Sequence, residues 1–379
     1  MPTGSDPDRA VPLPRSHVYL DHAASTALRP EARAAADLVA ADGPANPTGA
    51  HRDAQRMRAH LEAARESIAA LWSVAPHRVV FTSGGTESDN TAIAAGATRG
   101  RVLYSAVEHP AVLEPAVRTG GEAIPVDALG VVDLDALVRM LTSGAPVGIV
   151  SVMAANNETG VLQPLDDVAA VVETHAPTAW LHTDAVQAFT KVPVAAGARG
   201  LASVSAHKLG GPIGSGALVL GDDVEPEPLL WGGGQERGLR AGTPDPVASA
   251  AFAAAACAAA GQDWGRVGVL RDRLEAGLRR EVDDLVVHGA AAQRLPTHCH
   301  VGIAGVTADM VVIACDRAGL AVSSGSSCAS GAQKASGVLA AMGVSDEGAL
   351  RLSLGWNTTA DQVDFAVGVV ARAVAGLRT

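Results

Sequence analysis

The sequence predicts an α/β protein, with a mostly parallel, seven-stranded type of sheet in a large domain and a smaller α+β domain. Short apolar runs alternate with amphipathic helical segments, which is typical of a parallel sheet covered by helices on both faces. The chain has 379 residues, of which 48% are hydrophobic and 18% charged, so a folded protein with more than one core is expected.

The pattern places each element. Apolar runs predict sheet strands at residues 78–81, 102–105, 147–152, 179–182, 201–205 and 216–220, and helical spacing predicts helices at 31–41, 52–71, 134–141, 165–174 and 247–260. After residue 255 the alternation of strand and helix is less regular, with helices expected at 264–281, 308–318 and 361–377 and strands at 298–303 and 320–323. We therefore predict a large domain over 31–255, and a small domain formed by 1–30 together with 256–379.

Net charge, hydrophobic runs and cysteine spacing indicate which partners and which compartment to expect. The formal net charge is −11, which disfavours a general nucleic-acid surface. The first fourteen residues lack the features of a signal peptide, and the apolar run 247–260 is too short to span a bilayer, so no membrane partner is expected. The four cysteines form no CxxC pair, which fits a reducing compartment, and a cytoplasmic protein is predicted.

The segment SVSAHKLGGPIGSG carries the most informative residue, Lys208. It follows an apolar run and lies beside Ser205, His207 and several glycines. A lone lysine is usually a solvated surface charge. Here, however, TAWLHTDAVQ places Asp184 and Gln187 at the end of another predicted strand. A lysine that can form a Schiff base and an acid that can pair with a ring nitrogen are what a pyridoxal phosphate site requires.

Other polar residues follow neighbouring strands. In TSGGTES, Gly85 and Thr86 open a predicted helix whose N-terminus suits a phosphate, although such a turn is often only a turn. His109 follows the strand at 102–105 and could stack on a cofactor ring or simply cap a helix. In NNETG, Asn156 or Asn157 is placed to touch the ring or a substrate carboxylate. Ligands of open α/β sheets collect at this edge.

A glycine-rich loop and the cysteines complete the candidates. GGGQERGLRAGT, with Arg237, Arg240 and Thr243, suits a phosphate contact, a subunit boundary or a plain solvated loop. Cys257 and Cys315 are expected to be buried. Cys299 lies between two histidines that should face the other side of a strand, so no metal site is predicted. Cys328, in SSGSSCASG, lies in a loop of small polar residues and is the candidate nucleophile.

These motifs together resemble the cysteine desulfurases of the NifS/IscS kind, which are pyridoxal phosphate enzymes of fold type I in the class V aminotransferase group. The similarity runs from YLDHAAST to RLSLGWNTT and includes FTSGGTES, EHPAV, NNETG, HTDAVQ, SAHKLGGPIG, GGGQERGLRAGT and SSGSSCAS. The motif DHAAST departs from the usual DNAATT, and the cysteine context resembles the group with a long mobile loop. The resemblance implies a transferase that works as a homodimer.

The resemblance also implies a role for each site residue. Lys208 would hold the cofactor, Asp184 would pair with the ring nitrogen, Gln187 would reach the ring hydroxyl and His109 would stack on the ring. The phosphate would be bound by Gly85, Thr86, Ser205 and His207, with Thr243 reaching in from the other subunit. Asn157 and Arg351 would hold the carboxylate of the substrate.

The implied reaction removes sulfur from L-cysteine, leaving L-alanine and a persulfide on Cys328 that passes to a sulfur-acceptor protein. The acceptor stays open: iron–sulfur cluster assembly, tRNA thiolation, a biosynthetic pathway and DNA phosphorothioation all use such enzymes. Selenocysteine lyase and other class V enzymes are the alternatives on the same fold, and a catalytically idle scaffold is an alternative of another class.

Overall fold

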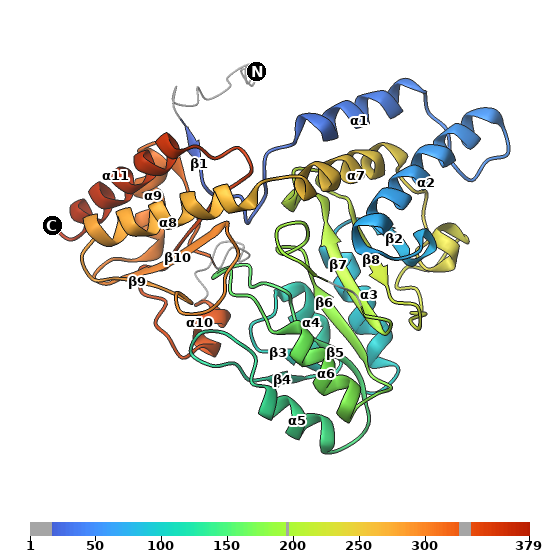
Figure 1. Cartoon of the computed structure of the whole chain (residues 1–379), viewed down its shortest axis with the longest axis horizontal. Helices are drawn as coiled ribbons and strands as arrows, with labels where there is room; N and C mark the ends of the chain where they lie inside the picture. Colours follow the sequence, from blue (N-terminus) through green and yellow to red (C-terminus); the bar gives the residue numbers. More distant parts are fainter. Residues whose placement is uncertain (1–16, 195–196, 326–334) are drawn as a thin grey trace, which may run out of the picture.

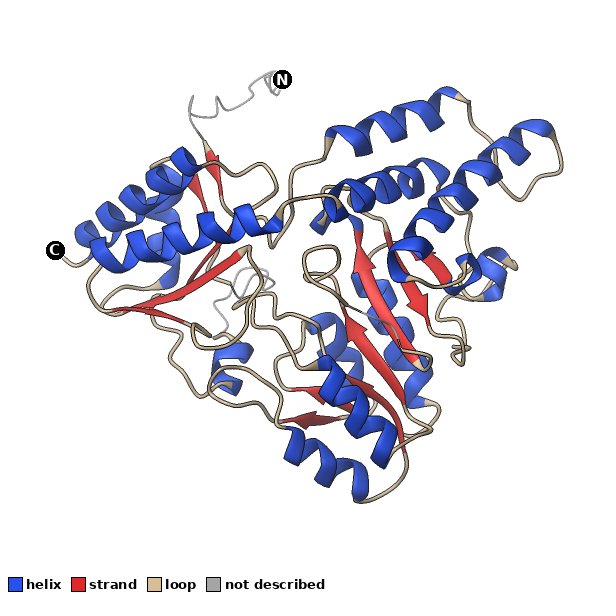
Figure 2. Ribbon diagram, viewed as in Figure 1, coloured by secondary structure: helices blue, strands red, loops and turns tan. Residues whose placement is uncertain are grey.

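The computed structural model describes residues 17–194, 197–325 and 335–379. Its larger part is a sheet between two layers of helices, and its smaller part is a second sheet with helices against one face (Figure 1). Figure 2 shows the strands of the larger and the smaller part as two separate groups, each with helices against it. The predicted α/β architecture is confirmed.

The large sheet has seven strands in the order β2-β8-β7-β6-β5-β3-β4. They are β2 (Val79–Thr82), β8 (Gly216–Leu220), β7 (Gly200–Ser205), β6 (Trp180–Asp184), β5 (Val147–Ser151), β3 (Arg101–Ser105) and β4 (Glu122–Ile124). β8 pairs antiparallel with β2 and β7, and the remaining neighbours are parallel. The sequence predicts six of these strands within two residues at either end. It misses β4, which is short and mostly exposed.

Helices cover both faces of this sheet because the central strands are buried along their whole length. One face packs against α3 (Gly85–Ala97) and α4 (Pro110–Arg118). The other packs against α2 (Arg52–Trp72), α5 (Leu134–Thr142), α6 (Leu165–His175) and α7 (Pro246–Ala260). α1 (Pro30–Ala41) lies on α7, whose alanines allow close packing. In the described part of the chain, no helix combines the length and hydrophobicity needed to cross a membrane.

The smaller part contains an antiparallel sheet of β12 (Leu350–Ser353), β10 (His298–Ile303) and β9 (Leu285–Val287). Its apolar face packs against α8 (Trp264–Glu281), α9 (Ala308–Arg317) and α11 (Ala360–Leu377), and α10 (Gly337–Ala341) lies apart from them. β1 (Val18–Tyr19) pairs in parallel with β11 (Leu320–Ala321), so the beginning of the chain lies beside its last third. The 3-10 turns are η1 (Pro76–Arg78), η2 (Ala206–Lys208) and η3 (Gln235–Gly238).

The cysteines test two predictions about burial. Cys315 is buried as expected, but Cys257 is exposed, so its prediction is wrong. The close contacts of α7 with α1 and α2 are made by alanines, and the thiol lies on the side of the helix that they leave open. In β10, Cys299 points into the apolar core, whereas His298 and His300 point to the opposite face, as the alternation predicts.

Candidate active site

Several of the predicted site residues, among them Lys208, Asp184 and His109, lie at the carboxyl edge of the large sheet. Lys208 ends the turn η2 that follows β7, and its Nζ donates hydrogen bonds to the carbonyls of Ala23 at 2.6 Å and Ala24 at 2.8 Å. Both carbonyls belong to the turn that follows β1. The lysine amine therefore lies where the N-terminal segment meets the large sheet.

Asp184 is the last residue of β6, the strand beside β7, and its carboxylate is buried. Its Oδ1 accepts a hydrogen bond from the Val186 N–H at 2.9 Å. Burial first, and then the charge of Asp89, raise the pKa of Asp184 to about 6, while the charge of His109 opposes both effects. A cationic ring nitrogen beside this carboxylate would compensate the charge that the fold has buried.

His109 is the N-cap of α4, and its Nδ1 accepts a hydrogen bond from the Ala111 N–H at 3.1 Å. The helix-capping interpretation that the sequence left open is therefore correct. Burial lowers the pKa of His109, the charge of Asp184 opposes this, and that of Lys208 adds to it. The imidazole thus lies within electrostatic reach of both Asp184 and Lys208, and it is neutral at physiological pH.

The turn that opens α3 forms a tight cradle beside Ser205. A Cβ placed on Gly85 would lie 2.7 Å from Cγ2 of Val186, so that position requires glycine. Gly84 has a φ of +149°, and a Cβ there would lie 3.8 Å from Oγ of Ser205. Thr86 is exposed at the first turn of the helix. Backbone N–H groups at a helix N-terminus beside a serine hydroxyl are suited to a phosphate.

Two further predicted residues contact the turn after β1. Gln187 is buried, and its Nε2 donates to the carbonyl of Ala23 at 2.9 Å, the same oxygen that accepts from Lys208. His207 Nδ1 lies 3.3 Å from Oγ of Ser25. Burial and the charge of Lys208 lower the pKa of His207 to about 4, so this ring is neutral.

Arg351 lies in β12, a strand that the sequence pattern misses, and its side chain is 2% exposed. Nη2 donates to Asp21 Oδ1 at 2.8 Å, and Nη1 donates to the carbonyl of Asn157 at 2.9 Å. Its buried Nε has no hydrogen-bond partner among residues 17–194, 197–325 and 335–379. Two of its nitrogens thus hold the guanidinium in place, and the N–H of the third, Nε, is left for a ligand such as a carboxylate.

The two asparagines of NNETG differ in their roles. The Asn156 amide donates to the carbonyl of Val107 at 3.0 Å, and its Oδ1 accepts from the N–H groups of Glu158 and Thr159 at 2.9 Å. Its side chain therefore shapes the turn. Asn157 contacts Arg351 through its backbone, and its own amide stays the candidate for ligand contact.

The glycine-rich loop 232–243 is anchored to the large part of the molecule. Arg240 pairs with Glu87 of α3 at 2.9 Å, and Glu236 pairs with the buried Arg65 of α2 at 2.7 Å. Thr243 is exposed at the end of this loop. Cys328, the predicted nucleophile, lies outside the described residues.

Sequence reasoning missed four ionisable residues around the site. Asp21 pairs with Arg351, and a buried group beneath Asp184 contains Asp89, Glu108 and His182. A signal for this group was available, because β6 ends in three polar residues inside a buried strand and Asp89 lies on the buried face of α3.

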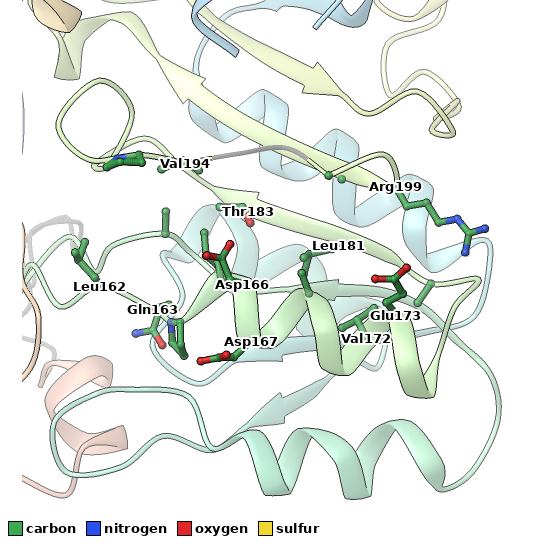
Figure 3. A pocket seen from close by; sticks show the side chains of 18 of the residues that line it. Leu162, Gln163, Asp166, Asp167, Val172, Glu173, Leu181, Thr183, Val194 and Arg199 are labelled. Carbon is green, nitrogen blue, oxygen red and sulfur yellow. The ribbon is translucent and has the colours of Figure 1, made fainter. Parts of the chain in front are cut away.

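Two cavities of very different size lie near the large sheet, and only the smaller one is lined by Lys208. A small cavity of about 10 Å³ beside Lys208 is lined by Gln187, Lys191 and His298 among others. A much larger cavity, about 1380 Å³, lies beside α6 and is lined by Leu181 and Thr183 of β6 (Figure 3). In the described part of the chain, no cluster of His, Cys, Asp and Glu side chains could hold a metal ion.

The comparisons with known proteins agree with this geometry. The family model of the class-V aminotransferases matches residues 18–365. An IscS-like cysteine desulfurase of Mycobacterium tuberculosis is 40% identical over 95% of this chain and 97% of its own. A solved NifS-like protein has a TM-score of 0.86 at 29% identity, covering 95% of this chain and 100% of that one. The solved structure of SspA in complex with cysteine has a TM-score of 0.77 at 27% identity, covering 89% of this chain and 98% of that one. The chain therefore belongs to the class-V aminotransferase family and, within it, to the cysteine desulfurases.

Proposed function

We propose that this protein is a pyridoxal phosphate-dependent cysteine desulfurase that takes sulfur from L-cysteine and releases L-alanine. The observation that carries the proposal is the convergence of Lys208, Asp184 and His109 at one edge of the sheet, within electrostatic reach of one another. The names of the relatives support the reaction, and the cysteine complex of SspA supports the substrate.

The residues fit pyridoxal phosphate. The turn at Gly84 and Gly85 has room for no side chain at Gly85 and presents helix N–H groups beside Ser205, as a phosphate requires. The buried carboxylate of Asp184 is placed to pair with a protonated ring nitrogen. A covalent bond to Nζ of Lys208 would then hold the aldehyde end. When bound, this cofactor supplies an aldehyde that captures amino groups and a ring that accepts electrons.

The chain's own residues bind the substrate and move its protons. Arg351 is held by Asp21 and Asn157 so that its buried Nε–H can meet the carboxylate of L-cysteine. The amine of Lys208, once released by the substrate's amino group, takes the proton from Cα of the substrate. His109, within electrostatic reach of Asp184 and Lys208, would stack on the cofactor ring.

Sulfur transfer is assigned to Cys328. Its thiolate attacks the sulfur of L-cysteine, a sulfur–sulfur bond forms, and the carbon–sulfur bond of the substrate breaks. Protonation of the carbon then gives L-alanine, so one cysteine thiol and one L-cysteine become a persulfide and L-alanine with no other oxidant or reductant. The persulfide is passed to an acceptor protein, for which iron–sulfur cluster assembly is suggested by the names of the relatives.

The proposal includes a homodimer in the cytoplasm. Thr243 is exposed at the end of a loop that Arg240 ties to Glu87 in the first turn of α3. A second subunit that brought its own Thr243 to this cradle would add a hydroxyl to the phosphate site. A reducing compartment also suits a reaction that needs a free thiol at Cys328.

The experiment is a paired assay with L-cysteine and a reductant, which records the yellow absorbance of the bound cofactor and the yields of sulfide and alanine. The wild type should show the band and equal yields of both products. Cys328→Ser should keep the band and lose turnover, and the exposed Cys257→Ser should behave as wild type. If Cys328→Ser still desulfurates free cysteine, or if only selenocysteine supports turnover, the proposed reaction is wrong.

A further inference from the structure

A buried polar network lies directly beneath Asp184, between the large sheet and α3. His182 precedes Asp184 by two residues on β6, so both side chains point to the same face. Its Nδ1 lies 2.8 Å from Oγ of Ser151 on β5, and its Nε2 lies 3.0 Å from Oγ of Ser203 on β7. Asp89 of α3 lies against the network: its Oδ1 is 3.4 Å from Nε2 of His182 and has no hydrogen-bond partner among the described residues.

The network has no contact with solvent. His182, Ser151 and Ser203 are fully buried, and Asp89 is 1% exposed. A buried carboxylate oxygen without a hydrogen-bond partner is costly, and an apolar interior would fill this position at lower cost. His182 lies two residues from Asp184 on the same face of β6, which indicates a role of the network toward the carboxylate of Asp184.

We propose that the Asp89–His182 pair, joined by Ser203, is a positioning unit that sets the charge next to Asp184 and thereby how firmly the bound cofactor holds its protons. The inference rests on the proposed function. Asp89 touches neither substrate nor cofactor in this scheme and acts through Asp184.

Asp89 is the member of this network whose charge changes near neutral pH. Burial raises the pKa of Asp89 to about 7, and a hydrogen bond from Ser203 lowers it. Burial lowers the pKa of His182 to about 4, so its ring is neutral. Glu108 faces the same space from the turn between β3 and α4, and burial followed by the charge of Asp184 raises its pKa well above the usual range.

The sign of the effect follows from these charges. Below pH 7 Asp89 is neutral, and Asp184 faces the cofactor without a second negative charge behind it. Above pH 7 Asp89 becomes anionic, and the added negative charge holds protons on the neighbouring cationic groups to higher pH. Asn at position 89 keeps the shape of the side chain and is neutral at every pH.

The test is a titration of purified holoenzyme from pH 6 to pH 9, with the absorbance of the cofactor band as the readout. Wild type and Asp89→Asn should give the same spectrum at pH 6. The midpoint of the spectral change should be lower in Asp89→Asn by on the order of one pH unit. Ser203→Ala removes the hydrogen bond that lowers the pKa of Asp89 and should move the onset of the wild-type effect to higher pH.

A matched control comes from the same helix. Thr91 of α3 is buried, and its hydroxyl donates to the carbonyl of Glu87 within the helix, so Thr91→Val should titrate as wild type. Superimposed titrations of wild type and Asp89→Asn, or a difference of equal size at every pH, would overturn the inference. A wild-type protein without the band would instead overturn the proposed function, and the inference with it.

Discussion

Replacing Glu236 with glutamine should destabilise the loop that carries Thr243. The carboxylate of Glu236 accepts two hydrogen bonds from Arg65, at 2.7 and 2.8 Å, and one from the Phe81 N–H at 2.9 Å. Glu236 has a φ of +45° and Arg237 one of +58°, which non-glycine residues rarely adopt. The ion pair therefore fixes a backbone conformation that the residues themselves disfavour.

The magnitude follows from the burial of both partners. The side chains of Arg65 and Glu236 are each 2% exposed, and removal of one partner from such a pair costs about 3 to 5 kcal/mol. Arg65 keeps a second carboxylate, Glu62, at 3.1 Å, but that side chain is 48% exposed and compensates little. Because glutamine still accepts one hydrogen bond, we expect a loss near the lower end, about 3 kcal/mol.

The assay is urea unfolding of the holoenzyme, followed by circular dichroism. Asp364→Asn is the matched control, because its pair with Arg273 joins side chains that are 51% and 54% exposed, where solvent screening leaves little contribution to stability. Glu236→Gln should unfold at clearly lower urea than this control. Equal midpoints for Glu236→Gln and Asp364→Asn would refute the argument that the buried pair holds the loop.

Three further predictions concern the site. Gly85→Ala should reduce the cofactor bound per chain, because its Cβ would lie 2.7 Å from Cγ2 of Val186. Gly376→Ala is the control, because the space around its Cβ is open, and it should bind cofactor normally. Equal cofactor absorbance per chain in the two variants would contradict this prediction. Arg351→Lys should raise KM for L-cysteine about 10- to 100-fold with a smaller change in kcat, because a lysine cannot reproduce the planar pair of donors of the guanidinium. An unchanged KM in steady-state kinetics would contradict the proposal that Arg351 binds the substrate carboxylate. Burial raises the pKa of Asp184 from 3.8 to about 6, so the folded cofactor-free protein binds a proton that the unfolded chain has released, and its Tm should fall as pH rises from 4 to 6. Asp184→Asn should lack that part of the decline, and parallel Tm curves for the two proteins would contradict it.

The sequence predicts the edge of the large sheet well because motif and strand coincide there. Asp184 ends β6 and Lys208 follows β7, and parallel neighbouring strands bring their carboxyl ends together without any knowledge of distant contacts. His109 similarly follows β3, and Gly85 opens the helix after β2. Local patterns plus one rule of topology are enough for these residues.

Other features depend on contacts between distant segments. The strand that carries Arg351 is four residues long, and its partner Asp21 lies 330 positions away, so no local pattern signals the pair. The pairing of Glu236 with Arg65 likewise joins residues that are 171 positions apart, so no local pattern signals it. Cys257 was expected to be buried because its neighbours are alanines, but which side of α7 meets α1 and α2 is decided by tertiary packing.

The guanidinium of Arg351 joins three separate parts of the chain: its own strand in the smaller sheet, Asp21 after β1, and the backbone of Asn157 in the larger part. If Arg351 binds the substrate carboxylate as proposed, substrate binding and the relative position of the two sheets depend on the same side chain. A substrate that moved this side chain would then also displace its two partners, Asp21 and Asn157. A change in how the sheets sit, caused by a partner protein at the surface, would in turn alter the affinity for the amino acid without touching the site.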